Sequence, residues 1–124
     1  MRKIEARIID ALRNQTEFRS GNTEVLNVPS IDGKDIEGKV LLHGNLIATF
    51  NRSLNQLEIE DGGWQSNTTK SRLNALLSEF APAYRIRQIK FHWYIDDLSK
   101  DVDNDMRHFT SYAVFRAGTL KDFG

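Results

Sequence analysis

The sequence predicts an α+β fold in which a small antiparallel sheet is packed by two helices, in the order α-β-β-β-α-β-β. Two segments, one near the N-terminus and one after residue 66, repeat their apolar residues with helical spacing. The segments between and after them alternate apolar with polar residues, as half-buried strands do. A sheet covered on one face by helices is typical of this pattern.

The first helix is expected over residues 2–14, where Ile4, Ile8 and Leu12 share one face. Residues 23–28 are rich in β-formers and predict a first strand that Pro29 closes. Two further apolar segments cover residues 39–43 and 46–50. Between them, Gly44-Asn45 indicates either a tight hairpin turn or a bulge in one long strand.

Residues 56–60 alternate regularly and predict a strand that ends at the glycine pair of Asp61-Gly62-Gly63. The second helix follows, because its apolar residues recur at i, i+3, i+4 and i+7: Leu73, Leu76, Leu77 and Phe80. Ser66 or Asn67 is suited to cap its start, and Pro82 ends it.

Two long strands, over residues 84–95 and 107–116, are expected to pair as a hairpin at the end of the chain. The first would place one set of apolar residues on the buried face: Ile89, Phe91, Trp93 and Ile95. The second would bury Phe109, Ala113 and Phe115. An acidic connection, residues 96–105, would join the two strands.

Size and composition favour a single domain, residues 1–124, that folds alone: 40% of residues are hydrophobic and 27% are charged. The absence of cysteine excludes disulfides and thiolate metal sites and favours a reducing cytoplasm. We recognise no signal peptide, and no segment approaches the roughly 20 apolar residues that a membrane span needs. A protein of the cytoplasm is therefore expected.

Charge is balanced over the whole chain, with 17 basic and 17 acidic side chains, so no general basic excess draws the protein to nucleic acid. The distribution along the chain is uneven. Residues 67–93 are mostly basic in their charged positions, whereas residues 94–106 are mostly acidic. The sequence therefore predicts local charged surfaces rather than a charged molecule.

The start of the second helix is the main candidate site. Unpaired backbone N–H groups at a helix start can bind an anion, and the segment adds side-chain donors: Ser66, Thr68, Thr69, Lys70 and Arg72. Trp64 could stack on a base. The same residues could instead serve only to cap the helix. The spacing required for an ATP-hydrolysing phosphate loop is absent.

His43 and Asn45, at the expected strand junction, are further candidates for this site, although a turn histidine can be purely structural. A possible second face lies on the late hairpin and mixes rings with positive charge: Lys90, His92, Tyr94, His108, Thr110 and Tyr112. Such a face suits either unpaired bases or a protein partner. We predict no catalytic residues, no metal site and no cofactor.

Residues 2–80 resemble a double-stranded-RNA-binding domain in the order helix, three strands, helix. That resemblance implies that the N-terminal turn of the second helix, with Lys70 and Arg72, meets phosphates. The segment departs from the family in having Thr-Thr-Lys-Ser-Arg instead of a lysine cluster, and in being followed by strands.

A closer resemblance covers most of the first 80 residues and rests on three motifs: Ser20-Gly21-Asn22-Thr23, Leu42-His43-Gly44-Asn45-Leu46-Ile47-Ala48 and the segment from Gly62 to Asn74. These look like small proteins encoded by tailed bacteriophages. The resemblance implies a phage origin and expression in the host bacterial cytoplasm. We therefore expect a non-enzymatic phage accessory protein that binds nucleic acid or a nucleotide phosphate. The alternative is a host-takeover or anti-defence protein that binds and inhibits a host protein.

Overall fold

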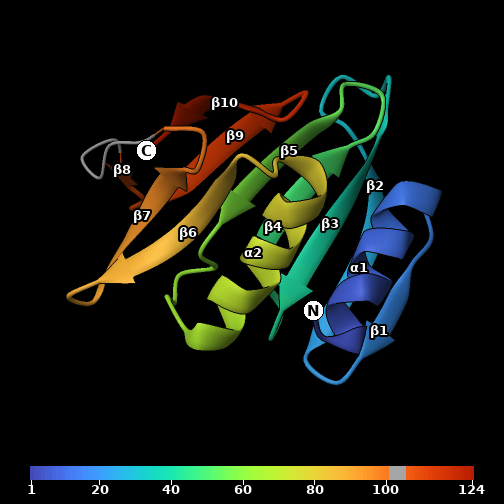
Figure 1. Ribbon diagram of the computed structural model, residues 1–124. Coiled ribbons are helices and arrows are strands. Elements are labelled where there is room, and N and C mark those ends of the chain that lie inside the picture. Colours follow the sequence, from blue (N-terminus) through green and yellow to red (C-terminus); the bar gives the residue numbers. More distant parts are fainter. Residues whose placement is uncertain (101–105) are drawn as a thin grey trace.

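The computed structural model describes residues 1–100 and 106–124, which hold two helices and ten strands (Figure 1). The first helix, α1, is followed by a run of five strands: α1 (Lys3–Asn14), β1 (Phe18–Ser20), β2 (Thr23–Pro29), β3 (Ile36–Leu42), β4 (Asn45–Asn51) and β5 (Gln56–Glu60). The remainder of the chain begins with the second helix: α2 (Asn67–Phe80), β6 (Tyr84–Ile89), β7 (His92–Asp97), β8 (Met106–His108), β9 (Tyr112–Arg116) and β10 (Thr119–Phe123). The α+β class is confirmed, but the predicted element order is wrong.

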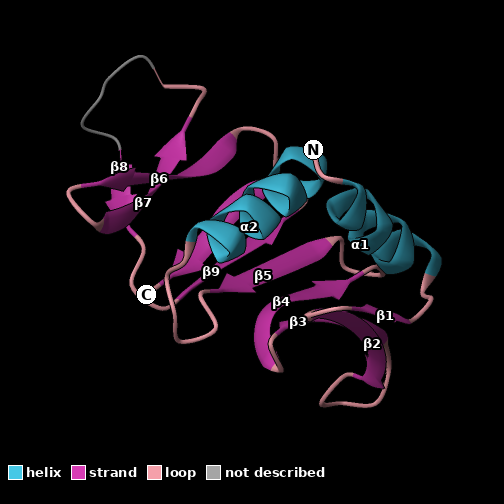
Figure 2. Cartoon of the chain, turned by 90° about the horizontal axis from the view of Figure 1, so that it is seen from below, coloured by secondary structure: helices cyan, strands magenta, loops and turns pink. Residues whose placement is uncertain are grey.

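Two sheets organise these strands. The larger has the order β1-β2-β3-β4-β5-β9-β10 and the smaller has the order β6-β7-β8, with every neighbouring pair antiparallel. Both helices lie on the same side of the larger sheet, and the smaller sheet lies beside α2 (Figure 2). The five strands between α1 and α2 also exclude the helix, three strands, helix order of a double-stranded-RNA-binding domain.

The core fills the space between the helices and the larger sheet. On α1, Ile8 and Leu12 are buried, and Leu12 reaches Gly38 of β3 so closely that a Cβ at Gly38 would lie 2.5 Å from its Cδ2. On α2 the predicted apolar face is buried as expected. The smaller sheet extends this core, because the ring of Tyr84 lies 5.2 Å from that of Phe115 between centroids.

The early turns follow the local chemistry. His43 and Gly44 both have positive φ, 52° and 78°, and join β3 to β4 as a two-residue turn, so the tight hairpin is the correct alternative. The register of the β3–β4 pair also shifts between Val40 and Leu41. Ser66 caps α2 by accepting a hydrogen bond from the Thr69 amide at 3.1 Å, which confirms it as one of the two predicted caps.

The late strands were predicted wrongly. The expected strand over residues 84–95 reverses at Lys90 and Phe91 and forms the β6–β7 hairpin, so Phe91 lies in a turn and is exposed instead of buried. The expected strand over residues 107–116 is divided: β8 pairs with β7 in the smaller sheet, whereas β9 pairs with β5 in the larger one. Neither β1 nor β10 was predicted.

Candidate functional site

Three connections meet at one end of the larger sheet, because neighbouring antiparallel strands begin and end there. They are the β1–β2 turn with Asn22, the β3–β4 turn with His43, and the loop from β5 to α2. The His43 amide donates to the Asn22 carbonyl at 2.7 Å, and the Asn22 side-chain nitrogen lies 3.3 Å from His43 Nε2. The three sequence motifs, far apart in the chain, therefore end beside one another.

A pocket of about 410 Å³ opens at this end of the sheet. We call it the helix-start pocket, and its lining residues come from β3, β4, the β5–α2 loop and α2: Leu42, His43, Asn45, Trp64, Ser66 and Thr68. A smaller hollow shares most of this lining and adds Thr69 and Asp61. The structure thus brings together most of the residues predicted for the first site.

The β5–α2 loop holds its shape through its own hydrogen bonds. Asp61 Oδ1 accepts from the Gly63 amide at 2.7 Å, and Asp61 Oδ2 accepts from Gln65 Nε2 at 3.3 Å. Gly62 has a φ of 70° and packs so closely that a Cβ would lie 3.1 Å from Ile47 Cγ2. This loop presents Trp64, whose side chain is 75% exposed, at the pocket.

Two of the first amides of α2 are already bonded. The Thr69 amide donates to Ser66 Oγ at 3.1 Å, and the Lys70 amide donates to the Ser66 carbonyl at 3.0 Å. Within the described part of the chain, the amides of Asn67 and Thr68 have no hydrogen-bond partner. The helix start therefore keeps two donors that can receive a ligand.

Thr69 and Arg72 are both buried, at 3% and 6% exposure. Arg72 Nη1 is 3.0 Å from Glu5 Oε2, and the side chains of this pair are only 7% and 3% exposed. The Ser71 hydroxyl donates to the same carboxylate at 2.7 Å. Arg72 thus joins α2 to α1, and we leave it out of the surface site. Glu5 was not singled out by the sequence, because a single glutamate in the first turn of a helix is usually solvated.

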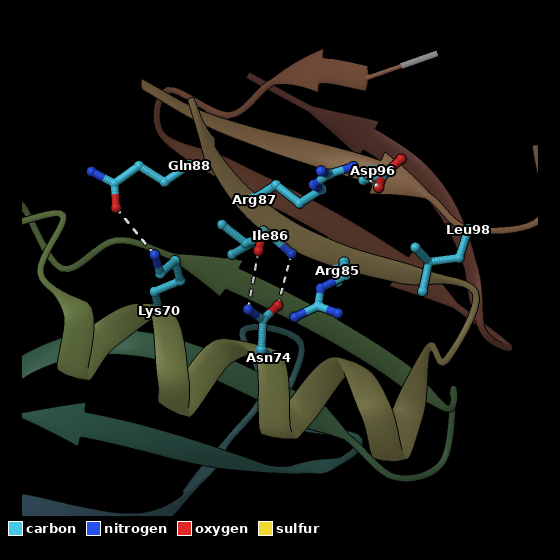
Figure 3. Close-up of a pocket in the computed structure, with 8 residues that line it drawn as sticks. All are labelled: Lys70, Asn74, Arg85, Ile86, Arg87, Gln88, Asp96 and Leu98. Atoms are coloured by element: carbon cyan, nitrogen blue, oxygen red, sulfur yellow. Dashed lines mark hydrogen bonds and ion pairs between the residues drawn. The ribbon is translucent and has the colours of Figure 1, made fainter. Parts of the chain in front are cut away.

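Lys70 lies outside the helix-start pocket and lines a second hollow of about 450 Å³ between α2 and β6, which we call the Lys70 groove (Figure 3). Its Nζ donates to Gln88 Oε1 at 3.1 Å. The groove also holds Arg85 and Arg87, with Asp96 on the neighbouring strand. The sequence counted these arginines in its basic segment but did not assign them to a site, because the β6–β7 turn was not recognised.

Asn74 fixes α2 to the open edge of β6. Its Nδ2 donates to the Ile86 carbonyl at 3.0 Å, and its Oδ1 accepts from the Ile86 amide at 2.7 Å (Figure 3). The amide side chain thus replaces a neighbouring strand at this residue. The floor of the Lys70 groove is therefore held in a fixed position.

The predicted second face is only partly assembled. His92, Tyr94 and His108 do lie together on the smaller sheet, with ring centroids 5.4 Å apart for the two histidines and 5.2 Å apart for Tyr94 and His108. Tyr112 lies on β9 of the larger sheet instead, where its hydroxyl donates to Asp122 at 3.0 Å. This hydrogen bond raises the pKa of Tyr112. Lys90 lies in the β6–β7 turn, and Thr110 is exposed in the segment between β8 and β9.

Other site classes were also searched. Among the described residues, no cluster of three or more His, Asp or Glu side chains could hold a metal ion. The aspartates at positions 101, 103 and 105 of the predicted acidic connection lie outside the described residues. No helix in the described ranges is long and apolar enough to cross a membrane.

The chain is a bacteriophage protein. The sequence model of one phage family, the Kyanoviridae Gp96 protein, matches residues 1–118. The chain belongs to this family, which confirms the phage origin that the three motifs implied. No curated protein and no solved structure matches the chain.

Proposed function

We propose that this phage protein is a small non-enzymatic accessory protein that binds nucleic acid or a nucleotide phosphate at the helix-start pocket, in the host bacterial cytoplasm. One observation carries the proposal: two separate motifs supply the lining of a single pocket. His43 and Asn45 come from one motif, and Trp64, Ser66 and Thr68 come from the other. The pocket is within the usual size range of small-ligand sites, about 300–1,000 Å³.

The phosphate would lie at the start of α2. The amides of Asn67 and Thr68 and the hydroxyl of Thr68 supply donors there, and the positive end of the helix dipole favours an anion. Lys70 lies outside the pocket, in the adjoining groove, and adds a positive charge in the same first turn of the helix. These groups suit a phosphate better than a neutral ligand.

The base would stack on Trp64. Trp64 is 75% exposed, so a ligand can reach its ring from solvent, and stacking of one base on an aromatic side chain contributes about 1–3 kcal/mol. His43 and Asn45 offer polar groups to the base edge from other walls of the pocket. A planar ring attached to a phosphate therefore matches both halves of the site.

Titration with thymidine monophosphate and adenosine diphosphate at low salt tests the proposal. Trp64 emission should be quenched on binding, while Trp93, which is 1% exposed, remains as an internal reference. Lys70→Ala should weaken binding of both nucleotides alike and make binding less sensitive to salt, because one positive charge near the phosphate is lost. Lys34→Ala is the matched control, because Lys34 lies in the loop between β2 and β3, at the end of these strands that is far from the helix-start pocket. Absence of binding at low salt would remove the proposal.

A second candidate function, inhibition of a host protein, is favoured by the helix-free face of the larger sheet. A hollow of about 380 Å³ there is lined by Asp35, Glu37 and Glu58, with the exposed side chains of Ile31 and Leu54 at its border. Such a surface suits a basic and apolar partner. A stoichiometric bacterial protein that survives nuclease treatment in a pull-down, and that Glu58→Lys abolishes, would favour this function.

A further inference from the structure

The smaller sheet has one buried and one exposed face. Its buried face carries Tyr84, Ile86, Trp93 and Ile95, which join the core. Because side chains alternate along a strand, the exposed face carries the residues between them. These are Arg85, Arg87 and Ile89 of β6, His92, Tyr94 and Asp96 of β7, and His108 of β8.

One row of this face runs across all three strands. Arg87 is opposite Tyr94, and Tyr94 is opposite His108. The rings of Tyr94 and His108 are 5.2 Å apart and inclined by 32°, and His92 meets His108 edge-on at 5.4 Å. Arg87 forms an ion pair with Asp96 at 3.1 Å, so this carboxylate is neutralised by one guanidinium. Aromatic and imidazole rings therefore lie beside the Arg87 guanidinium on this face.

The Lys70 groove continues this row on its β6 side. Arg87 belongs to both, and Lys70 and Arg85 line the groove from its two walls (Figure 3). Asp96 is the one acidic residue among the described residues that line it, and it already pairs with Arg87. The groove thus keeps a positive excess that matches the charge of a phosphate chain.

The β6–β7 turn contains residues that its backbone conformation disfavours. Two-residue hairpin turns with positive φ at both positions are dominated by Asn and Gly, yet here Lys90 has a φ of 50° and Phe91 a φ of 70°. Phe91 is also 89% exposed. A phenylalanine is disfavoured at this position because positive φ is unfavourable for a bulky residue and because its apolar ring is exposed to water. Its presence indicates a use for the ring at the rim of the exposed face.

From these observations we infer that the exposed face of the smaller sheet binds single-stranded nucleic acid. Unpaired bases stack on Phe91, Tyr94 and His108, and the phosphates lie along the Lys70 groove. Duplexes bind poorly, because the faces of paired bases are covered by their neighbours. This surface is distinct from the helix-start pocket and shares only Lys70 with the proposed phosphate site there. Substitutions of Trp64 and of Phe91 therefore test the two proposals separately.

The central test compares two equivalent turn substitutions, with a labelled 12-residue oligothymidylate or oligouridylate as the probe. Phe91→Gly relieves the positive φ and removes the ring, so the fold is kept while affinity falls about 5-fold or more. Ala117→Gly is the matched control, since Ala117 has a φ of 50° in the β9–β10 turn. Thermal midpoints of both variants should equal or exceed that of the unchanged protein.

Further measurements separate this surface from the pocket and from a protein partner. Arg85→Ala should reduce the salt slope of oligonucleotide binding by about 1, whereas Trp64→Ala should affect mononucleotides more than Phe91→Gly does. Oligonucleotide binding equal to that of a duplex of the same length overturns the inference. An oligonucleotide affinity that Phe91→Gly leaves unchanged also overturns it. So does the finding that substitutions on this face abolish capture of a bacterial protein but leave oligonucleotide binding intact.

Discussion

At the scale of single residues, two ion pairs join α1 to α2 and differ sharply in their surroundings. Glu5 and Arg72 are buried near the start of both helices, whereas Arg13 and Glu79 meet near their ends with side chains 50% and 34% exposed. Exposed pairs contribute little because water screens them, but a buried charge that loses its partner is strongly destabilising. The two pairs therefore make a controlled comparison.

Glu5→Gln should lower the free energy of unfolding by about 3–5 kcal/mol, because Arg72 keeps a buried charge without a counter-charge. Glu79→Gln, the same chemical change in the exposed pair, should cost about 0–1 kcal/mol. Urea denaturation of both variants measures the difference. Equal losses in the two variants would contradict a structural role for the buried pair.

At the scale of secondary structure, the seam between α2 and β6 depends on a single amide side chain. Asn74 forms hydrogen bonds with both the N–H and the C=O of Ile86, a buried residue. Without this amide, the two backbone groups would lie against the helix with no partner. The seam also sets the position of the Lys70 groove, so stability and binding geometry share one residue.

Asn74→Ala should destabilise the protein by about 1–3 kcal/mol, since it leaves a donor and an acceptor unpaired. Ser78→Ala, at an exposed position of the same helix, should change stability by no more than about 0.5 kcal/mol. Chemical denaturation compares the two. A loss in Asn74→Ala no larger than that in Ser78→Ala would show that water replaces the amide.

Local patterns identified most elements of the first 80 residues, although they missed β1, and they failed for the last 40. Helical spacing identified both helices, and glycine-containing turns located β3 to β5. The β6–β7 turn has no glycine or asparagine, so its alternating residues were taken for one continuous strand. The pairing of β9 with β5 bridges more than fifty residues, and no local pattern encodes such a contact. β10 is too exposed to show a buried face.

The sequence predicted most residues of the candidate site but not how they are arranged in space. The capping segment and the His43 turn could be identified because glycine and hydroxyl residues mark such places. Their meeting in one pocket depends on the antiparallel order of the sheet, which the sequence did not establish. Arg72 could not be assigned correctly, because its orientation on α2 depends on a partner in α1.

At the scale of the whole molecule, zero net charge conceals two regions of opposite sign. Lys70, Arg85 and Arg87 gather between α2 and the smaller sheet, whereas Glu37 and Glu58 lie on the helix-free face of the larger sheet. On that face burial raises the pKa of Glu60, and the nearby Glu58 raises it further. A balanced composition is therefore compatible with a local site for an anion.

Acid should weaken the whole fold through Glu5. Burial alone would raise the pKa of Glu5, but hydrogen bonds from Ser71, the Arg2 amide and Arg72, together with the guanidinium charge, outweigh it and hold the pKa below its ordinary value of 4.5. The unfolded chain therefore takes up this proton first. The stability that the carboxylate contributes is present above pH 4.5 and is lost as the pH falls through the folded-state value.

The difference in unfolding free energy between the unchanged protein and Glu5→Gln should thus be largest near neutral pH and shrink below pH 4.5. Asp32 and Asp97 also have lowered pKa values, through hydrogen bonds from Ser30 and Ser99 first of all, but they are common to both proteins and cancel. Denaturation at a series of pH values gives the comparison. A difference that is constant with pH would contradict the assignment.

The adjacency of β5 and β9 has a consequence for synthesis on the ribosome. Strands β1 to β5 can assemble as they emerge, but the outer side of β5 has no neighbour until β9 follows, because α2 and the smaller sheet are encoded between them. At about 5–20 residues per second, that delay lasts several seconds. During this time the nascent chain presents an unpaired strand edge. A chain cut short before β9 would keep that edge permanently, and the edge could pair with a strand of another chain.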